Sequence, residues 1–118
     1  MILVVDSGST KTDWIALNDK GEEIFSTQTL GLNPQMLSNE ILNERIKNNF
    51  DIYKNRKSVD KLFFYGAGCG VDSTQERILK VFKSIFINSE FDIKEDTYAA
   101  VYSAVDIGIP SIVNIIGT

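Results

Sequence analysis

The chain has 118 residues, of which 43% are hydrophobic, so it contains material for one compact core and not for two. Its formal net charge of −4 argues against nucleic acid or an anionic membrane surface as its main partner, because both favour a basic patch. With no histidine and one cysteine, a His/Cys metal site, a histidine-based catalytic triad and an intramolecular disulfide are excluded.

The first predicted elements are three strands. Residues 2–5, Ile-Leu-Val-Val, form a short apolar run that ends at Ser-Gly, which is typical of a central strand buried on both faces. Residues 14–18 and 22–30 follow as two further strands, joined by the turn sequence Asn-Asp-Lys-Gly. Because tight turns connect them before any helix begins, we expect the first three strands to be antiparallel.

The next predicted elements alternate between helix and strand. A helix is expected to run to about Phe50, capped by Asn33 or Ser38, with one apolar stripe formed by Leu37, Ile41, Leu42, Ile46 and Phe50. A strand over 59–66 then leads into three glycines. A helix over 73–87 follows, with Arg77, Lys80 and Lys83 on its polar side. A strand at 90–96, a small-residue helix at 97–108 and an apolar strand at 110–118 are the last predicted elements. The fold class we expect is α/β, with a mixed five-stranded sheet.

The turn after the first strand has the composition of an anion-binding turn. Hydroxylated residues surround Gly8, which can adopt backbone angles that are closed to other residues, and Asp6 stands at the end of the strand. A Walker A loop fails here, because Thr10 occupies the position of the glycine that should precede Lys11. A dinucleotide fingerprint at Gly66, Gly68 and Gly70 is weak, since its third glycine comes one residue early. The hairpin pattern D-x-G-x-T fits Asp6, Gly8 and Thr10.

Five segments in this order resemble a known family. They are VVDSGSTKTDW, GLNP, YGAGCG, EDTYAAVYSA and IVNIIGT. The chain is similar to the N-terminal half of the BadF/BadG/BcrA/BcrD ATPases, in the branch that resembles N-acetylglucosamine kinases. The resemblance implies a ribonuclease-H-like, actin-like ATPase domain over residues 1–118 with helices on both faces of its sheet. It also implies a second domain, absent from this chain, that carries the adenosine site.

The resemblance implies a role for each candidate site residue. Phosphoryl transfer needs donors to phosphate oxygens, an acid that holds hydrated Mg²⁺, and a carboxylate beside the acceptor hydroxyl. Asp6 matches the magnesium position and Asp96 the catalytic base. The residues that match ATP phosphate contacts are Asp6, Ser7, Gly8, Ser9, Thr10, Lys11, Gly117 and Thr118, and those that match the sugar pocket are Asn33, Gly68 and Cys69.

Structural interpretations compete with these roles. Asp96 could be a plain helix cap, because aspartate is a favoured cap whatever the function. Asn33, which precedes a proline, could simply form a turn. Cys69 is better interpreted as a small packed residue than as a nucleophile, since no base is available to activate it.

Three functions remain open. The favoured one is an ATP- and Mg²⁺-dependent kinase that phosphorylates an amino sugar, with N-acetylglucosamine as the expected substrate. The alternatives are an ATPase that activates an iron–sulfur dehydratase or reductase, and a non-catalytic nucleotide-binding module. We expect the isolated 118-residue chain to be inactive without its C-terminal domain, and the intact protein could be a monomer or a homodimer. With neither a signal peptide nor an apolar run of membrane-spanning length, a cytoplasmic protein is expected.

Overall fold

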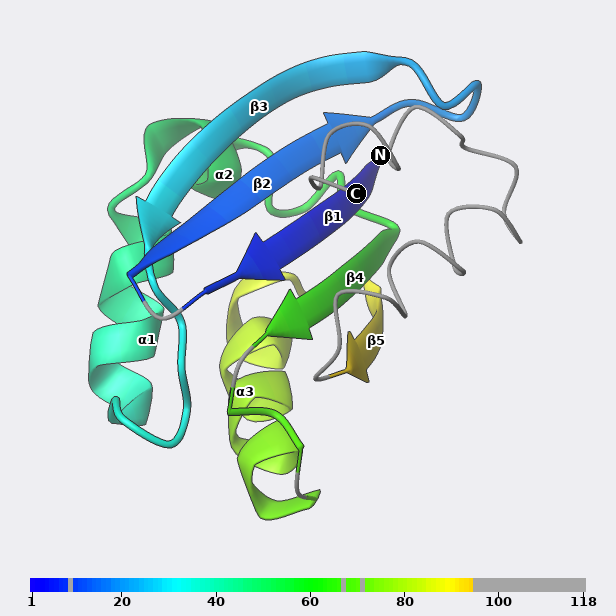
Figure 1. The fold of residues 1–118 in the computed structure, drawn as a ribbon. Helices are drawn as coiled ribbons and strands as arrows, with labels where there is room; N and C mark the ends of the chain where they lie inside the picture. The colour runs from blue at the N-terminus through cyan, green and yellow to red at the C-terminus, as the bar shows by residue number, and fades with distance from the viewer. Residues whose placement is uncertain (9, 67, 71, 95–118) are drawn as a thin grey trace.

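The computed structural model describes residues 1–8, 10–66, 68–70 and 72–94, which form one mixed sheet and three helices (Figure 1). The five strands of the sheet lie in the order β3-β2-β1-β4-β5. In chain order the elements are β1 (Ile2–Ser7), β2 (Lys11–Leu17), β3 (Glu23–Leu30), α1 (Asn39–Lys47), α2 (Phe50–Lys54), β4 (Lys61–Gly66), α3 (Asp72–Ile85) and β5 (Glu90–Lys94).

The strand pairing confirms the predicted mixed sheet. β1 pairs with β2 and β2 with β3 in antiparallel register, whereas β4 pairs in parallel with β1 on one side and with β5 on the other. Short turns suffice for the antiparallel pairs, and the helical connections supply the crossovers that parallel pairs need. β1 therefore lies at the centre of the sheet, where both of its edges are hydrogen-bonded.

The single helix expected to run to Phe50 is two helices. Of the two predicted caps, Asn33 and Ser38, it is Ser38 that caps α1, its hydroxyl accepting a hydrogen bond from the Ile41 N–H at 3.3 Å. Asn49 then takes an extended conformation and its side chain caps α2, accepting from the Ile52 N–H at 3.1 Å. The predicted apolar stripe is wrong at two positions: Ile41 within α1 is 41% exposed, and Phe50, which begins α2 after the chain turns, is 73% exposed.

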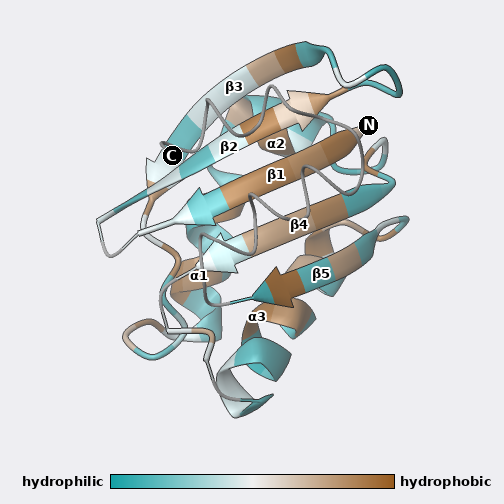
Figure 2. Ribbon diagram, turned by 45° about the vertical axis from the view of Figure 1, so that its right-hand side comes forward, coloured by the Kyte–Doolittle hydropathy of each residue, from teal (hydrophilic) through white to brown (hydrophobic). Residues whose placement is uncertain are grey.

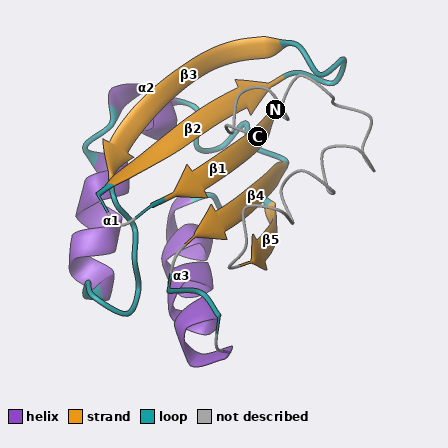
Figure 3. Ribbon diagram, in the orientation of Figure 1, coloured by secondary structure: helices purple, strands orange, loops and turns teal. Residues whose placement is uncertain are grey.

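The main core lies between the sheet and the described helices, all of which cover the same face (Figures 1 and 3). Phe64 from β4 makes an edge-on contact with the Phe82 ring of α3, with 5.1 Å between centroids. On the other face Val4 and Ile15 are also buried, at 2% exposure each, so the central strands are apolar on both sides as expected. The helix predicted at 97–108 and the strand at 110–118 lie outside the described residues.

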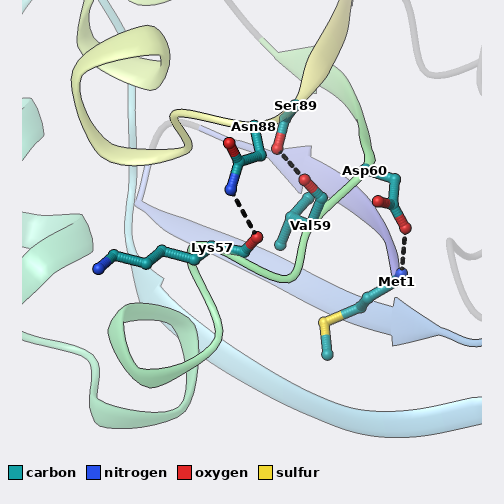
Figure 4. A network of polar contacts seen from close by, with 6 residues as sticks. All are labelled: Met1, Lys57, Val59, Asp60, Asn88 and Ser89. Carbon is teal, nitrogen blue, oxygen red and sulfur yellow. Dashed lines mark hydrogen bonds and ion pairs between the residues drawn. The ribbon is translucent and has the colours of Figure 1, made fainter.

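The two ends of the sheet differ in chemistry. At the amino ends of the parallel strands, the Met1 amino group contacts the Asp60 carboxylate at 2.7 Å (Figure 4). Beside it, Ser89 Oγ donates to the Val59 carbonyl oxygen, which holds the start of β5 against the start of β4. These contacts lie at one end of the sheet, and the turns and loops that follow the carboxyl ends of β1 and β4 lie at the other. No described helix is long and apolar enough to cross a membrane.

Candidate functional site

The candidate site lies where β1 and β4 end. In Figure 2 the hydrophobic colouring along β1 changes to hydrophilic at the head of its arrow, which is the position of Asp6 and Ser7. The β1–β2 turn, the loop after β3 and the loop after β4 all leave the sheet at this edge (Figure 1). Ligands of open sheets that contain parallel strands usually bind at such carboxyl ends.

Asp6 is a half-buried carboxylate opposite a second carboxylate. It alternates with Val5, whose side chain lies in the core against the helices, so Asp6 is on the other face of the sheet. Its partner across the antiparallel pair is Asp13, which accepts a hydrogen bond from Gln28 Nε2 at 2.6 Å. Burial, and to a lesser degree the charge of Asp13, raise the pKa of Asp6 above its ordinary value of 3.8. The ionised form of Asp6 is therefore one that a cation would stabilise.

Ser7 uses its side chain to hold the neighbouring loop. Its hydroxyl oxygen accepts from the Leu32 N–H at 2.9 Å and lies 2.9 Å from the Thr12 hydroxyl. Since Thr12 in turn donates to the Leu30 carbonyl oxygen at 3.1 Å, the proton between the two hydroxyls belongs to Ser7. The Ser7 hydroxyl is thus engaged inside the protein, and a phosphate contact at this residue would have to come from its backbone.

The turn itself is tight and exposed. The Gly8 N–H donates to the Lys11 carbonyl oxygen at 2.9 Å, and the Gly31 N–H donates to the Thr10 carbonyl oxygen at 3.0 Å. Contrary to expectation, Gly8 does not have a positive φ. A Cβ built on it would lie 3.6 Å from the Lys11 carbonyl oxygen, an ordinary van der Waals contact, so a side chain could be accommodated at this glycine. Thr10 and Lys11 are exposed there, while Ser9 lies outside the described residues.

The two loops predicted to line a sugar pocket contact each other. Gly68 has a φ of +83°, and a Cβ built on it would lie 2.0 Å from Asn33 Oδ1, so only glycine fits between the backbone and the Asn33 amide. Asn33 also forms a turn, because its Oδ1 accepts from the Gln35 N–H at 2.9 Å and its carbonyl oxygen accepts from Leu37. The turn and the contact with Gly68 are therefore made by the same residue.

Cys69 follows Gly68 but points the other way. Its side chain is fully buried within the main core, and its carbonyl oxygen accepts from Gln75 Nε2 at 2.6 Å. This placement agrees with a packed residue, and any contact with a ligand would have to be made by the backbone of the loop.

The other predicted site residues lie outside the described residues: Asp96, Gly117 and Thr118. One residue of the site was missed. Asp13 was not singled out, although a hairpin with a tight turn pairs residues equidistant from the turn, and Asp6 and Asp13 are equidistant from the turn that Gly8 and Lys11 close. That spacing was the signal available in the sequence.

A first prediction concerns the acidity of Asp6. In a ¹³C NMR titration its pKa should lie above 3.8, and Asp13→Asn should lower it only part of the way, because burial is the larger cause. A raised pKa in the folded state means that stability is lost as pH rises from 3.8 through the folded pKa. Asp6→Asn should therefore have a larger free energy of unfolding than the wild type at pH values above the folded-state pKa of Asp6. This advantage should disappear below pH 3.8. An Asp6 pKa at or below 3.8 would contradict the electrostatic picture.

A second prediction compares two glycines. Gly68→Ala should destabilise the protein by about 1–3 kcal/mol in urea unfolding, because a side chain at positive φ is strained and its Cβ would overlap the Asn33 amide. Gly8→Ala is the matched control and should change stability by less than about 0.5 kcal/mol. Equal effects of the two substitutions would show that the loop contact is not built as described.

Comparison with known proteins finds matches among solved structures. No family model and no curated protein matches the chain. Among solved structures, a crystal structure from Porphyromonas gingivalis named as a "putative N-acetylglucosamine kinase" superimposes with a TM-score of 0.76 and 27% sequence identity. The match covers 90% of this chain and 38% of that protein, so the chain spans well under half the length of its neighbour. The described domain therefore has a sugar-kinase-like fold of the ribonuclease-H type.

Proposed function

We propose that the chain is the N-terminal domain of an ATP-dependent kinase that phosphorylates an amino sugar, with N-acetylglucosamine as the substrate. A second domain that carries the adenosine site would complete the enzyme. The proposal is supported by the name of the structural neighbour and by the chemistry at the carboxyl ends of β1 and β4.

One hydrogen bond carries the proposal. The Leu32 N–H donates to Ser7 Oγ at 2.9 Å, across 25 residues of sequence. Ser7 follows Asp6 at the start of the predicted phosphate turn, and Leu32 precedes Asn33 in the predicted sugar loop. The bond therefore joins the two segments that a sugar kinase must bring together, since transfer requires phosphate and acceptor hydroxyl to be held in line.

The residues at this edge suit a magnesium ion with bound nucleotide. Asp6 is a half-buried carboxylate whose ionised form is disfavoured by burial and by Asp13. A bound divalent cation would offset the free-energy cost of keeping this carboxylate ionised. Asp6 would hold the ion through its hydration shell. When bound, magnesium neutralises charge on the phosphates during transfer. The exposed Lys11 ammonium would add positive charge at the same turn.

The acceptor sugar would be held by the loops after β3 and β4. The Asn33 amide can both donate and accept a hydrogen bond, which suits a sugar hydroxyl or an acetamide group. Gly68, without a side chain, lets the loop after β4 pack against the Asn33 amide, which brings the two loops together. Asp96 would take the proton of the acceptor hydroxyl, a role that rests on the family resemblance.

The proposed reaction can be measured directly. The intact natural protein should consume ATP in proportion to N-acetylglucosamine when tested against a panel of amino sugars, with Mg²⁺ present. Asp6→Asn should weaken the use of Mg·ATP more than the use of sugar, and Lys83→Met, a change on the exposed side of α3, should leave both unchanged. ATP hydrolysis that no sugar stimulates would favour the activator or the nucleotide-binding alternative.

The role proposed for Asp96 has its own test. General base catalysis contributes about 10²–10⁴-fold, so Asp96→Asn in the intact protein should lower kcat by about that factor, equivalent to about 3–5 kcal/mol. Sugar KM should change much less. Because asparagine caps helices about as well as aspartate, a purely structural Asp96 would tolerate this substitution. Full sugar-dependent activity in Asp96→Asn would exclude it as the base.

A further inference from the structure

Arg77 holds the loop that contains Asn33, although the sequence pattern places it on the solvent side of its helix. From α3, its Nη2 donates to the Leu37 carbonyl oxygen at 2.8 Å and its Nη1 to the Pro34 carbonyl oxygen. Its Nε donates to Asn39 Oδ1, at the first residue of α1, at 3.2 Å. One guanidinium thus bonds three acceptors that lie 38 to 43 residues earlier in the chain.

Only an arginine can serve all three acceptors together. Its guanidinium presents five N–H donors in a rigid plane, whereas a lysine ammonium is a single point charge on a flexible stem. The acceptors are two backbone carbonyl oxygens of the loop before α1 and the amide oxygen of Asn39, and all three part-buried hydrogen bonds would be lost if the guanidinium were removed. Arg77 is therefore a tie between α3 and the whole segment from Pro34 to Asn39.

The residues just before this segment are also held in place. Arg45 of α1 donates from Nη1 to the Gly31 carbonyl oxygen at 2.6 Å, and Ser7 accepts from the Leu32 N–H. Asn33 lies between these contacts and the Arg77 tie, with its amide against Gly68. The side chain expected to contact the ligand is thus located by residues on both sides of it.

We propose that Arg77 is a positioning residue that sets the location of the Asn33 amide for sugar binding. The inference rests on the proposed sugar kinase function, and it assigns Arg77 no contact with the substrate. Arg77 acts through the loop: its loss frees the Pro34 and Leu37 carbonyl oxygens, and the turn that presents Asn33 loses its support from α3.

Steady-state kinetics of the intact natural protein test this role. Arg77→Met should raise the KM for N-acetylglucosamine by about 10- to 100-fold, while the KM for ATP changes less than about twofold, because only the sugar loop is displaced. The sugar KM of Arg77→Lys should lie between those of the wild type and Arg77→Met, since lysine can restore one of the three bonds. Lys80→Met is the charge-matched control on the exposed side of α3.

A second control separates positioning from general loss of stability. Val81→Ala removes core volume from the same helix, and the Val81 side chain makes none of the hydrogen bonds described above, so the substitution should destabilise the protein without the selective rise in sugar KM. If Val81→Ala reproduces the effect of Arg77→Met, or if Arg77→Met leaves sugar KM unchanged, the proposal is overturned.

Hydrogen exchange gives a readout that does not depend on activity. The Met36 and Leu37 amides donate to the Asn33 carbonyl oxygen, and they should exchange about tenfold faster or more in Arg77→Met than in Val81→Ala. Equal exchange in the two variants overturns the proposal. If the wild-type protein phosphorylates no sugar, the proposed function fails, and the exchange rates still decide whether Arg77 fixes the loop.

Discussion

A short relay of hydrogen bonds at the end of β1 is the contact on which the site depends. It runs from the Leu32 N–H to the Ser7 hydroxyl, on to the Thr12 hydroxyl and back to the Leu30 carbonyl oxygen. Each hydroxyl both donates and accepts, so the relay satisfies buried polar groups that would otherwise cost stability. Because it links β1, β2 and the chain after β3, the first turn and the Asn33 loop keep one relative position.

The sheet explains why a carboxylate can be held beside this relay. Side chains alternate along β1, so Ser7 joins the network on the helix side while Asp6 lies on the opposite face. Burial raises the pKa of Asp6, and Asp13 adds a second negative charge across the antiparallel pair. These surroundings disfavour the ionised carboxylate of Asp6, so a cation bound there would stabilise it. The carboxylate lies near the end of a strand that is paired on both edges.

The loops around this edge gain their order from distant residues. Asn33 is held between contacts from Ser7, from Arg45 of α1 and from Arg77 of α3, and Gly68 closes against it from the end of β4. A loop of few residues without regular structure is thereby fixed by four separate elements. Such an arrangement is what a binding site needs, since a ligand then does not have to order the loop on binding.

The sequence by itself determined the parts that depend on local pattern. The apolar run of β1, the short turns and the alternation of helix and strand were enough to predict the mixed sheet and the position of Asp6 at a strand end. Tertiary structure decided the rest. The hydrogen bond from the Asn49 amide to Thr27, the contact of Gly68 with Asn33 and the bonds of Arg77 all depend on partners many residues away. Pattern shows which residues prefer a helix or a strand, but which donor meets which acceptor is set only when the elements pack.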